Sequence, residues 1–288
     1  MLKKQLIKYF KSLGIEVYTN TKARGHQGFF LKNRIDISKN TTEERIIPTL
    51  LHEFAHFIHS KIEPDMVKTG GSLEILFNLP AYRLIDLSTI QKELLLVTNF
   101  VDEHSLCHKL KAHKEQIKKK IKTQENIVKQ YYPNFMRSKK FKEFDKYIKK
   151  SKAKYLLRYD RVKFVSPFLR RIEIYSIDAI EKDFPDMPTA FCAYIRLKSA
   201  QKKQARNSAR INKLNKYYSK PTELFARLVE YVYINKEKAH DFAPNATQIF
   251  LELLESGYYK ELKEVFHLIP DLKIDTTGLP LKYSFAHN

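Results

Sequence analysis

The stretch PTLLHEFAHFIHS, residues 48–60, constrains the fold more than any other part of this sequence. On a helix it would be apolar on nearly every side, and a helix of that kind is normally buried. It nevertheless carries His52, Glu53, His56 and His59. Ionisable groups are costly to bury unless each has a partner or a metal. The chain must therefore bury this helix and surround it with groups that satisfy those side chains.

The spacing of the first three polar residues indicates a metal site. His52 and His56 are four residues apart, so their imidazoles project from one helix face and can hold one ion. Glu53 lies beside them, where a carboxylate can take a proton from a metal-bound water without ligating the metal. This is the HExxH pattern of zinc peptidases, in which the metal lowers the pKa of water from about 16 to about 7. We predict His52 and His56 as zinc ligands and Glu53 as the catalytic base; His59 lies one turn too far along.

Two later stretches offer a third ligand. PTELFARLVE, residues 221–230, places Glu223, Arg227 and Glu230 on one helical stripe. VDEHSLCH, residues 101–108, offers Glu103. We favour Glu223, because the small Ala226 after it lets two helices approach closely around a short zinc–oxygen bond. Glu103 stays the alternative ligand, and Arg227 and Glu230 are expected to orient the ligands or to pack.

The rest of the pattern predicts a mostly helical α+β protein with a small N-terminal sheet. Glycine is rare, with seven in 288 residues, whereas Lys, Leu, Ile and Glu are abundant. A helix over residues 3–12, a strand at 15–19 and a hairpin over 28–38 precede the histidine helix. Pro48 should kink that helix or delay its start. Further helices are expected over 87–132, 139–157, from Pro188 onward, and over 222–233.

The charge and the cysteines bear on partners and location. The formal net charge is +21, which favours either a lysine-rich soluble surface or attraction to nucleic acid or a DNA-bound protein through the basic helices. Two cysteines make no disulfide framework, and the sequence pattern leads us to expect neither a signal peptide nor a membrane-spanning segment. We expect a cytoplasmic protein, unless a dedicated secretion system exports it.

The motifs together resemble a known family. The N-terminal helix, the strand, the hairpin ending RIDIS and then TLLHEFAH resemble the minimal core of ImmA/IrrE-type metallopeptidases. YYSKPTELFARLVEYV resembles the second motif block of zincin domains in polyvalent proteins of mobile elements. The resemblance implies a gluzincin-type zinc metalloendopeptidase with Glu223 as third ligand. We predict one zincin-like domain over residues 1–288, with a basic helical insertion around 104–170 that has no counterpart in the family, and the third-ligand helix around 221–234.

Two functions follow as hypotheses. The first is a zinc-dependent metallopeptidase that cleaves a protein or peptide substrate, held as an added strand along the hairpin edge. The alternative is a basic, nucleic-acid-associated accessory protein of a mobile element, in which the zincin core is vestigial or regulatory. A chelator should abolish peptide hydrolysis, and added salt should weaken nucleic-acid binding.

Overall fold

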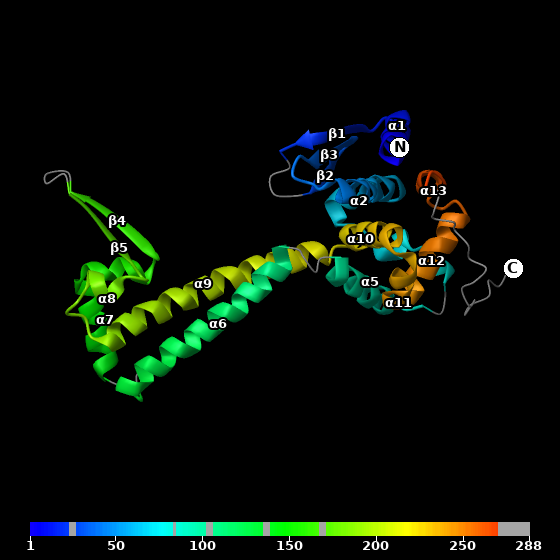
Figure 1. The fold of residues 1–288 in the computed structure, drawn as a ribbon. Helices are drawn as coiled ribbons and strands as arrows, with labels where there is room; N and C mark the ends of the chain where they lie inside the picture. The colour runs from blue at the N-terminus through cyan, green and yellow to red at the C-terminus, as the bar shows by residue number, and fades with distance from the viewer. Residues whose placement is uncertain (23–26, 83–84, 102–105, 135–138, 167–170, 270–288) are drawn as a thin grey trace. The chain divides into compact units, whose positions relative to one another are not determined.

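The computed structural model describes residues 1–22, 27–82, 85–101, 106–134, 139–166 and 171–269. The protein is α+β and mostly helical, as predicted, with one three-stranded and one two-stranded sheet among these residues (Figure 1). The chain divides into two compact units. Unit 1 comprises Met1–Glu103 and Lys216–Asn288, and unit 2 comprises His104–Asn215. No described helix is both long enough and apolar enough to cross a membrane.

Unit 1 begins with helix α1 (Leu2–Ser12) and a mixed three-stranded sheet. Strand β3 (Arg34–Ser38) lies in the middle, with β1 (Glu16–Thr21) parallel to it on one side and β2 (Gly28–Leu31) antiparallel on the other. The hairpin turns at Lys32, whose φ of 56° is left-handed. The predicted strand and hairpin are therefore present. In this order β2 is an edge strand, with one side open to a further strand.

The histidine helix, α2, spans Glu43–Ile62 and is buried from Pro48 to His59. It begins five residues before Pro48, so the proline does not delay its start. Phe54 stacks on Phe10 of α1, with ring centroids 4.3 Å apart, and this contact anchors one side of the helix. The apolar residues of 48–58 thus fill the core and fix the side on which the imidazoles lie.

The remaining elements of unit 1 complete a helical layer around α2. Helix α10 packs against α2 and also against α5, and Figure 1 shows it beside α2. Buried apolar residues from α1, α2, α5, α10 and α12 form one continuous core. The bounds of these elements are α3 (Met66–Thr69), α4 (Leu73–Leu76), η1 (Leu79–Ala81), α5 (Leu87–Val101), α10 (Pro221–Ile234), α11 (Lys236–Phe242), α12 (Pro244–Glu255) and α13 (Lys260–His267).

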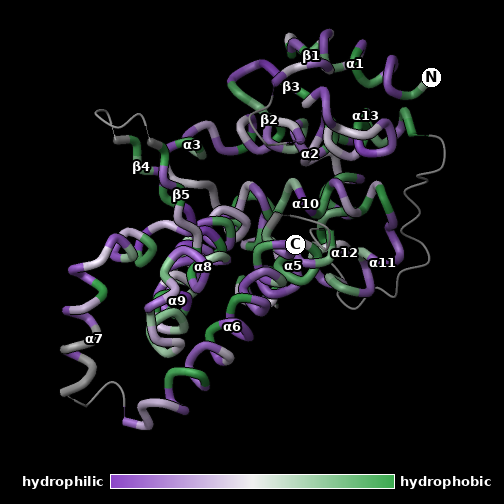
Figure 2. The backbone as a smooth tube through the Cα atoms, turned by 60° about the vertical axis from the view of Figure 1, so that its left-hand side comes forward, coloured by the Kyte–Doolittle hydropathy of each residue, from purple (hydrophilic) through white to green (hydrophobic). Residues whose placement is uncertain are grey.

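Unit 2 contains two long helices and a smaller set of elements with its own core. In α9, Asn207 donates a hydrogen bond to the carbonyl of Leu110 in α6, at 2.8 Å. The second core includes Ile148, Leu156, Ile180 and Ile195. The elements are α6 (Leu106–Tyr131), α7 (Lys139–Lys150), η3 (Lys152–Leu157), β4 (Arg161–Ser166), β5 (Arg171–Ser176), α8 (Ile180–Asp183) and α9 (Thr189–Tyr218), whose last residues belong to unit 1. Figure 2 shows hydrophilic residues along much of α6.

Unit 2 begins where the basic insertion was expected to begin, but it extends to Asn215 rather than to about residue 170. It holds a second core of its own, because α9 packs on the elements that precede it. The single zincin-like domain with an insertion therefore stays a prediction. The expected third-ligand helix corresponds to α10, which spans Pro221–Ile234.

Candidate metal centre

Three side chains from two helices meet in the core of unit 1. His52 and His56 of α2 and Glu223 of α10 each offer one ligand atom, and these atoms lie within 4.8 Å of one another. Their exposed fractions are 8 %, 9 % and 4 %. Because α10 packs directly on α2, the first turn of α10 brings Glu223 to the face that carries the two imidazoles. This group could hold a metal ion.

The separations within this group suit a shared ion better than direct hydrogen bonds. Glu223 Oε2 is 3.6 Å from His52 Nε2, and Glu223 Oε1 is 3.5 Å from His56 Nε2. Good N–H···O hydrogen bonds are shorter, at about 2.7–3.2 Å. Two ligands of one tetrahedral zinc ion, each bound at about 2.0–2.2 Å, lie about 3.3–3.6 Å apart. The three residues therefore fit a zinc ion by geometry and by donor type.

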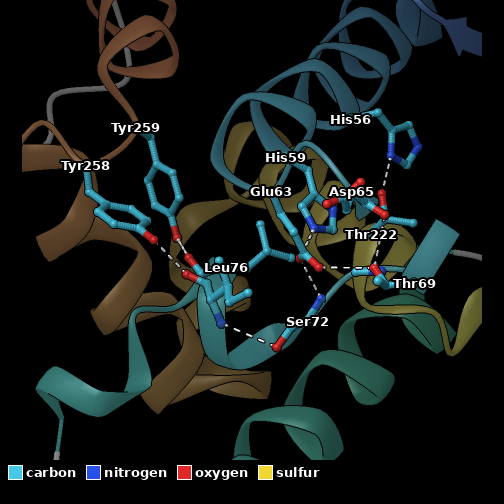
Figure 3. A network of polar contacts seen from close by, with 12 residues as sticks. His56, His59, Glu63, Asp65, Thr69, Ser72, Leu76, Thr222, Tyr258 and Tyr259 are labelled. Atoms are coloured by element: carbon cyan, nitrogen blue, oxygen red, sulfur yellow. Dashed lines mark hydrogen bonds and ion pairs between the residues drawn. The ribbon is translucent and has the colours of Figure 1, made fainter. Parts of the chain in front are cut away.

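The other ring nitrogen of each histidine is held by a protein partner. His56 Nδ1 is 2.8 Å from Thr222 Oγ1, the residue just before Glu223 (Figure 3). His52 Nδ1 is 3.2 Å from Glu230 Oε2, within ion-pair distance, although their alignment is not that of a hydrogen bond. Partners of this kind orient a metal-binding imidazole and leave Nε2 for the metal. Both Nδ1 atoms thus face protein, and both Nε2 atoms face Glu223.

Glu230 belongs to a buried ion-pair network that joins the two helices. It accepts from Arg45 Nη2 of α2 at 2.6 Å and from Arg227 Nη1 of its own helix at 2.9 Å. Burial would raise the pKa of Glu230, but Arg227 and His52 lower it to about 2, so the carboxylate is charged. A carboxylate held by two arginines has little freedom to rotate, and its position fixes the ring of His52.

The protonation of the histidines and of Glu223 reflects their neighbours. Burial alone would lower the pKa of His52, but the carboxylates of Glu223 and Glu230 raise it to about 9. Burial lowers the pKa of His56 to about 3. Burial would raise the pKa of Glu223, yet the two histidines lower it to about 2. The carboxylate is therefore ionised, as a metal ligand must be.

Glu53 stands beside these residues without a polar partner. It is 5 % exposed and has no hydrogen bond or ion pair to another described residue. Burial raises its pKa to about 7, against the effect of the nearby His52. Strand β2 lies close by: a Cβ on Gly28 would be 3.0 Å from Glu53 Oε1 and 2.7 Å from Thr49 Cγ2. Glycine at 28 thus permits the edge strand to approach the carboxylate.

The remaining predicted residues lie as follows. Glu103, the alternative ligand, is outside the described residues. His59 is fully buried, and its Nε2 lies 3.1 Å from Glu63 Oε2 rather than at the metal group (Figure 3). Gly71 covers this ring so closely that a Cβ would be 2.2 Å from His59 Cε1. His59 is therefore a core residue that ties the end of α2 to the following loop.

Sequence reasoning missed two partners of the metal group. Thr222 and Arg45 were not singled out, although Arg45 lies seven residues before His52 and so on the same side of α2. Burial and the nearby Glu223 carboxylate raise the pKa of Tyr217.

No protein-family model matches the chain, and comparison with curated proteins and with solved structures finds no significant match. The function must therefore be inferred from the geometry of the site.

Proposed function

We propose that this protein is a zinc-dependent metallopeptidase of the zincin type. One observation carries the proposal: both Nε2 atoms face the Glu223 carboxylate at 3.5–3.6 Å while Glu53 stands unpaired beside them. Two imidazoles and one carboxylate are a common ligand set for catalytic zinc, and they leave a fourth position open. The pKa of about 9 means that His52 holds a proton at neutral pH without the metal, and metal binding would release that proton. An additional buried carboxylate without a partner is what hydrolysis requires as a proton acceptor.

Each residue then has a distinct task. His52, His56 and Glu223 hold the ion, which supplies Lewis-acid chemistry by polarising a carbonyl oxygen and lowering the pKa of water. Glu53 accepts the proton that the attacking water loses and delivers it to the leaving amine, so it ends each cycle ionised again.

The edge strand supports a peptide as the substrate class. Strand β2 has an open side in the sheet order β1-β3-β2, and Gly28 in it lies against Glu53. An extended peptide added to such an edge gains main-chain hydrogen bonds along its length. Its backbone would then run past the carboxylate that handles the proton.

The test measures metal content and hydrolysis together. Purified protein, stripped of metal and reconstituted, should bind about one zinc ion per chain. His56→Ala should lose the metal, whereas the matched change at an exposed histidine, His113→Ala, should keep it. Zinc-loaded protein should cleave members of a mixed peptide pool, as read by mass spectrometry of new termini, and a chelator should stop this.

Two results would reject the proposal. If zinc binding is unchanged in both His52→Ala and His56→Ala, the group is not a metal site. If the zinc-loaded wild type cleaves nothing in the pool or in denatured protein mixtures, the metal has a role other than peptide hydrolysis.

A further inference from the structure

The positive charge of the protein belongs almost entirely to unit 2. His104–Asn215 contains 30 lysines and arginines and 10 acidic residues, a formal charge of +20. The rest of the chain contains 23 lysines and arginines and 22 acidic residues, a formal charge of +1. Lysines that served only solubility would have no reason to concentrate in one unit. Such segregation is typical of a surface that attracts a polyanion.

Helix α9 presents part of this charge as an exposed stripe. Arg206, Arg210 and Lys213 follow one another at i, i+4 and i+7, with Lys202 one turn earlier, and all four are exposed. No carboxylate among the described residues forms an ion pair with any of the four. By contrast Lys203, to one side of the stripe, pairs with Asp160 at 2.5 Å.

The cations of this stripe crowd one another. Burial lowers the pKa of Lys202, and so do the positive charges of Arg158, Arg206 and Lys198. Asp160 is a nearby counter-charge for Arg206, but it pairs with Lys203, so like charges along the stripe still raise the free energy of the unbound surface. A row of phosphates placed along the stripe would relieve that repulsion and release counterions.

The shape of the stripe suits the backbone of a double helix. Lys202 to Lys213 spans about 17 Å at 1.5 Å per residue, which corresponds to about five base pairs at 3.4 Å each. The exposed Ala205 and Ala209 between the basic residues have small side chains that allow close approach. No aromatic residue lies in this stretch, whereas surfaces that bind single strands rely on aromatic stacking.

An anionic membrane is the competing partner. Basic helices bind membranes through an apolar face, and α7 has basic residues at both ends. However, Ile148 of α7 is fully buried, and Tyr147 packs on Phe191 with ring centroids 5.0 Å apart. The β4–β5 ribbon does expose Val165 and Ile172, so the experiment must include vesicles.

We propose that unit 2 binds double-helical nucleic acid through its phosphates, with Lys202, Arg206, Arg210 and Lys213 of α9 as a contact surface. The inference uses none of the residues of the metal group. It therefore stands or falls separately from the peptidase proposal.

The test is salt-dependent binding by the full-length protein to labelled duplex DNA and to duplex RNA of the same sequence. Fluorescence anisotropy is followed between about 50 and 200 mM salt. The variant Arg206→Gln/Arg210→Gln/Lys213→Gln should show a slope of log K against log salt smaller in magnitude by about 2.7, since each phosphate contact contributes about 0.9. The matched control is Lys4→Gln/Lys8→Gln/Lys11→Gln, exposed at the same spacing on α1 of unit 1.

The proposal predicts a wild-type slope for the control variant, and binding to either duplex supports it. The preferred duplex then identifies the nucleic acid. Equal weakening in both triple variants would show that only net charge matters, and would overturn the α9 surface. Binding to vesicles containing phosphatidylserine but to neither duplex would assign unit 2 to a membrane. Absence of salt-sensitive binding by the wild type would leave the charge as a solubility feature and reject the proposal.

Discussion

Units 1 and 2 place their ionisable side chains in opposite environments. In unit 1, His52, Glu53, Glu223 and Glu230 are buried, and the unit is nearly neutral overall. In unit 2, many of the lysines and arginines lie at exposed positions of α6 and α9. Burial multiplies the effect of each charge on its neighbours, and exposure weakens it.

Buried and exposed charged groups are suited to different functions. Buried groups such as Glu230 between Arg45 and Arg227 hold one geometry, because breaking a buried pair leaves an uncompensated charge. Exposed cations fix no geometry, but together they attract a partner over a distance of about a Debye length. Unit 1 is therefore suited to chemistry at one point, and unit 2 to contact over a surface.

The largest expected effect tests the chemistry of unit 1 alone. Glu53→Gln keeps the shape and burial of the side chain but removes the proton acceptor. Peptide hydrolysis should fall by about 10²–10⁴-fold, while zinc content and duplex binding stay at wild-type values. Glu74→Gln, at an exposed position of the same unit, serves as the control. Full hydrolysis by Glu53→Gln would rule out Glu53 as the base.

The next effect concerns the third ligand. Glu223→Ala removes a direct zinc ligand. It should therefore weaken zinc binding by more than the roughly 10–100-fold that is typical when a residue that only orients a ligand is lost. Competition with a chromophoric chelator measures the affinity. Glu103→Ala should bind zinc as the wild type does; if it loses zinc while Glu223→Ala keeps it, Glu103 is the ligand.

A smaller effect is expected at the partner of His56. Thr222→Val removes the hydroxyl 2.8 Å from His56 Nδ1 and leaves that nitrogen buried without a partner. Zinc affinity should fall by about 10–100-fold. Thr247→Val is the matched control, since Thr247 is a buried threonine of unit 1 that donates to Ala239 away from the metal group. Equal loss in both variants would attribute the effect to general destabilisation.

The smallest effect probes an ion pair in unit 2. Asp160 accepts from Ser199 and pairs with Lys203. Burial would raise its pKa, but Lys203 and Ser199 lower it below the ordinary 3.8. A carboxyl group whose pKa is lower in the folded than in the unfolded protein stabilises the fold at pH values above its unfolded-state pKa. This stabilisation is lost as the pH falls through its folded-state pKa.

Asp160→Asn should therefore lower the melting temperature at pH 7. The corresponding loss in the free energy of unfolding is at most about 1 kcal/mol, as for other exposed ion pairs. The difference from wild type should shrink as the pH falls below about 3.8. Thermal melts of both proteins across this range test it. A difference that persists at the lowest pH would show that the carboxylate charge is not its source.

Much of unit 1 could be predicted from local patterns. The hairpin around Lys32, the α2 helix and the α10 helix follow from periodicity and turn chemistry, which depend on residues close in sequence. The common face of His52 and His56 follows from helical spacing alone. Pro48 lies inside α2, which begins at Glu43, so the late start that this proline suggested is not found.

The sequence by itself therefore determined which side chains share a face within each helix, together with the total charge of +21. Only the tertiary structure decided which faces meet. It placed Thr222 on His56 across 166 positions and Arg45 on Glu230 across 185. It also assigned nearly all of the net charge to unit 2, by packing α9 with the elements before it. The physical reason is that helix periodicity is set by neighbours in the chain, whereas partners and boundaries depend on packing between distant segments.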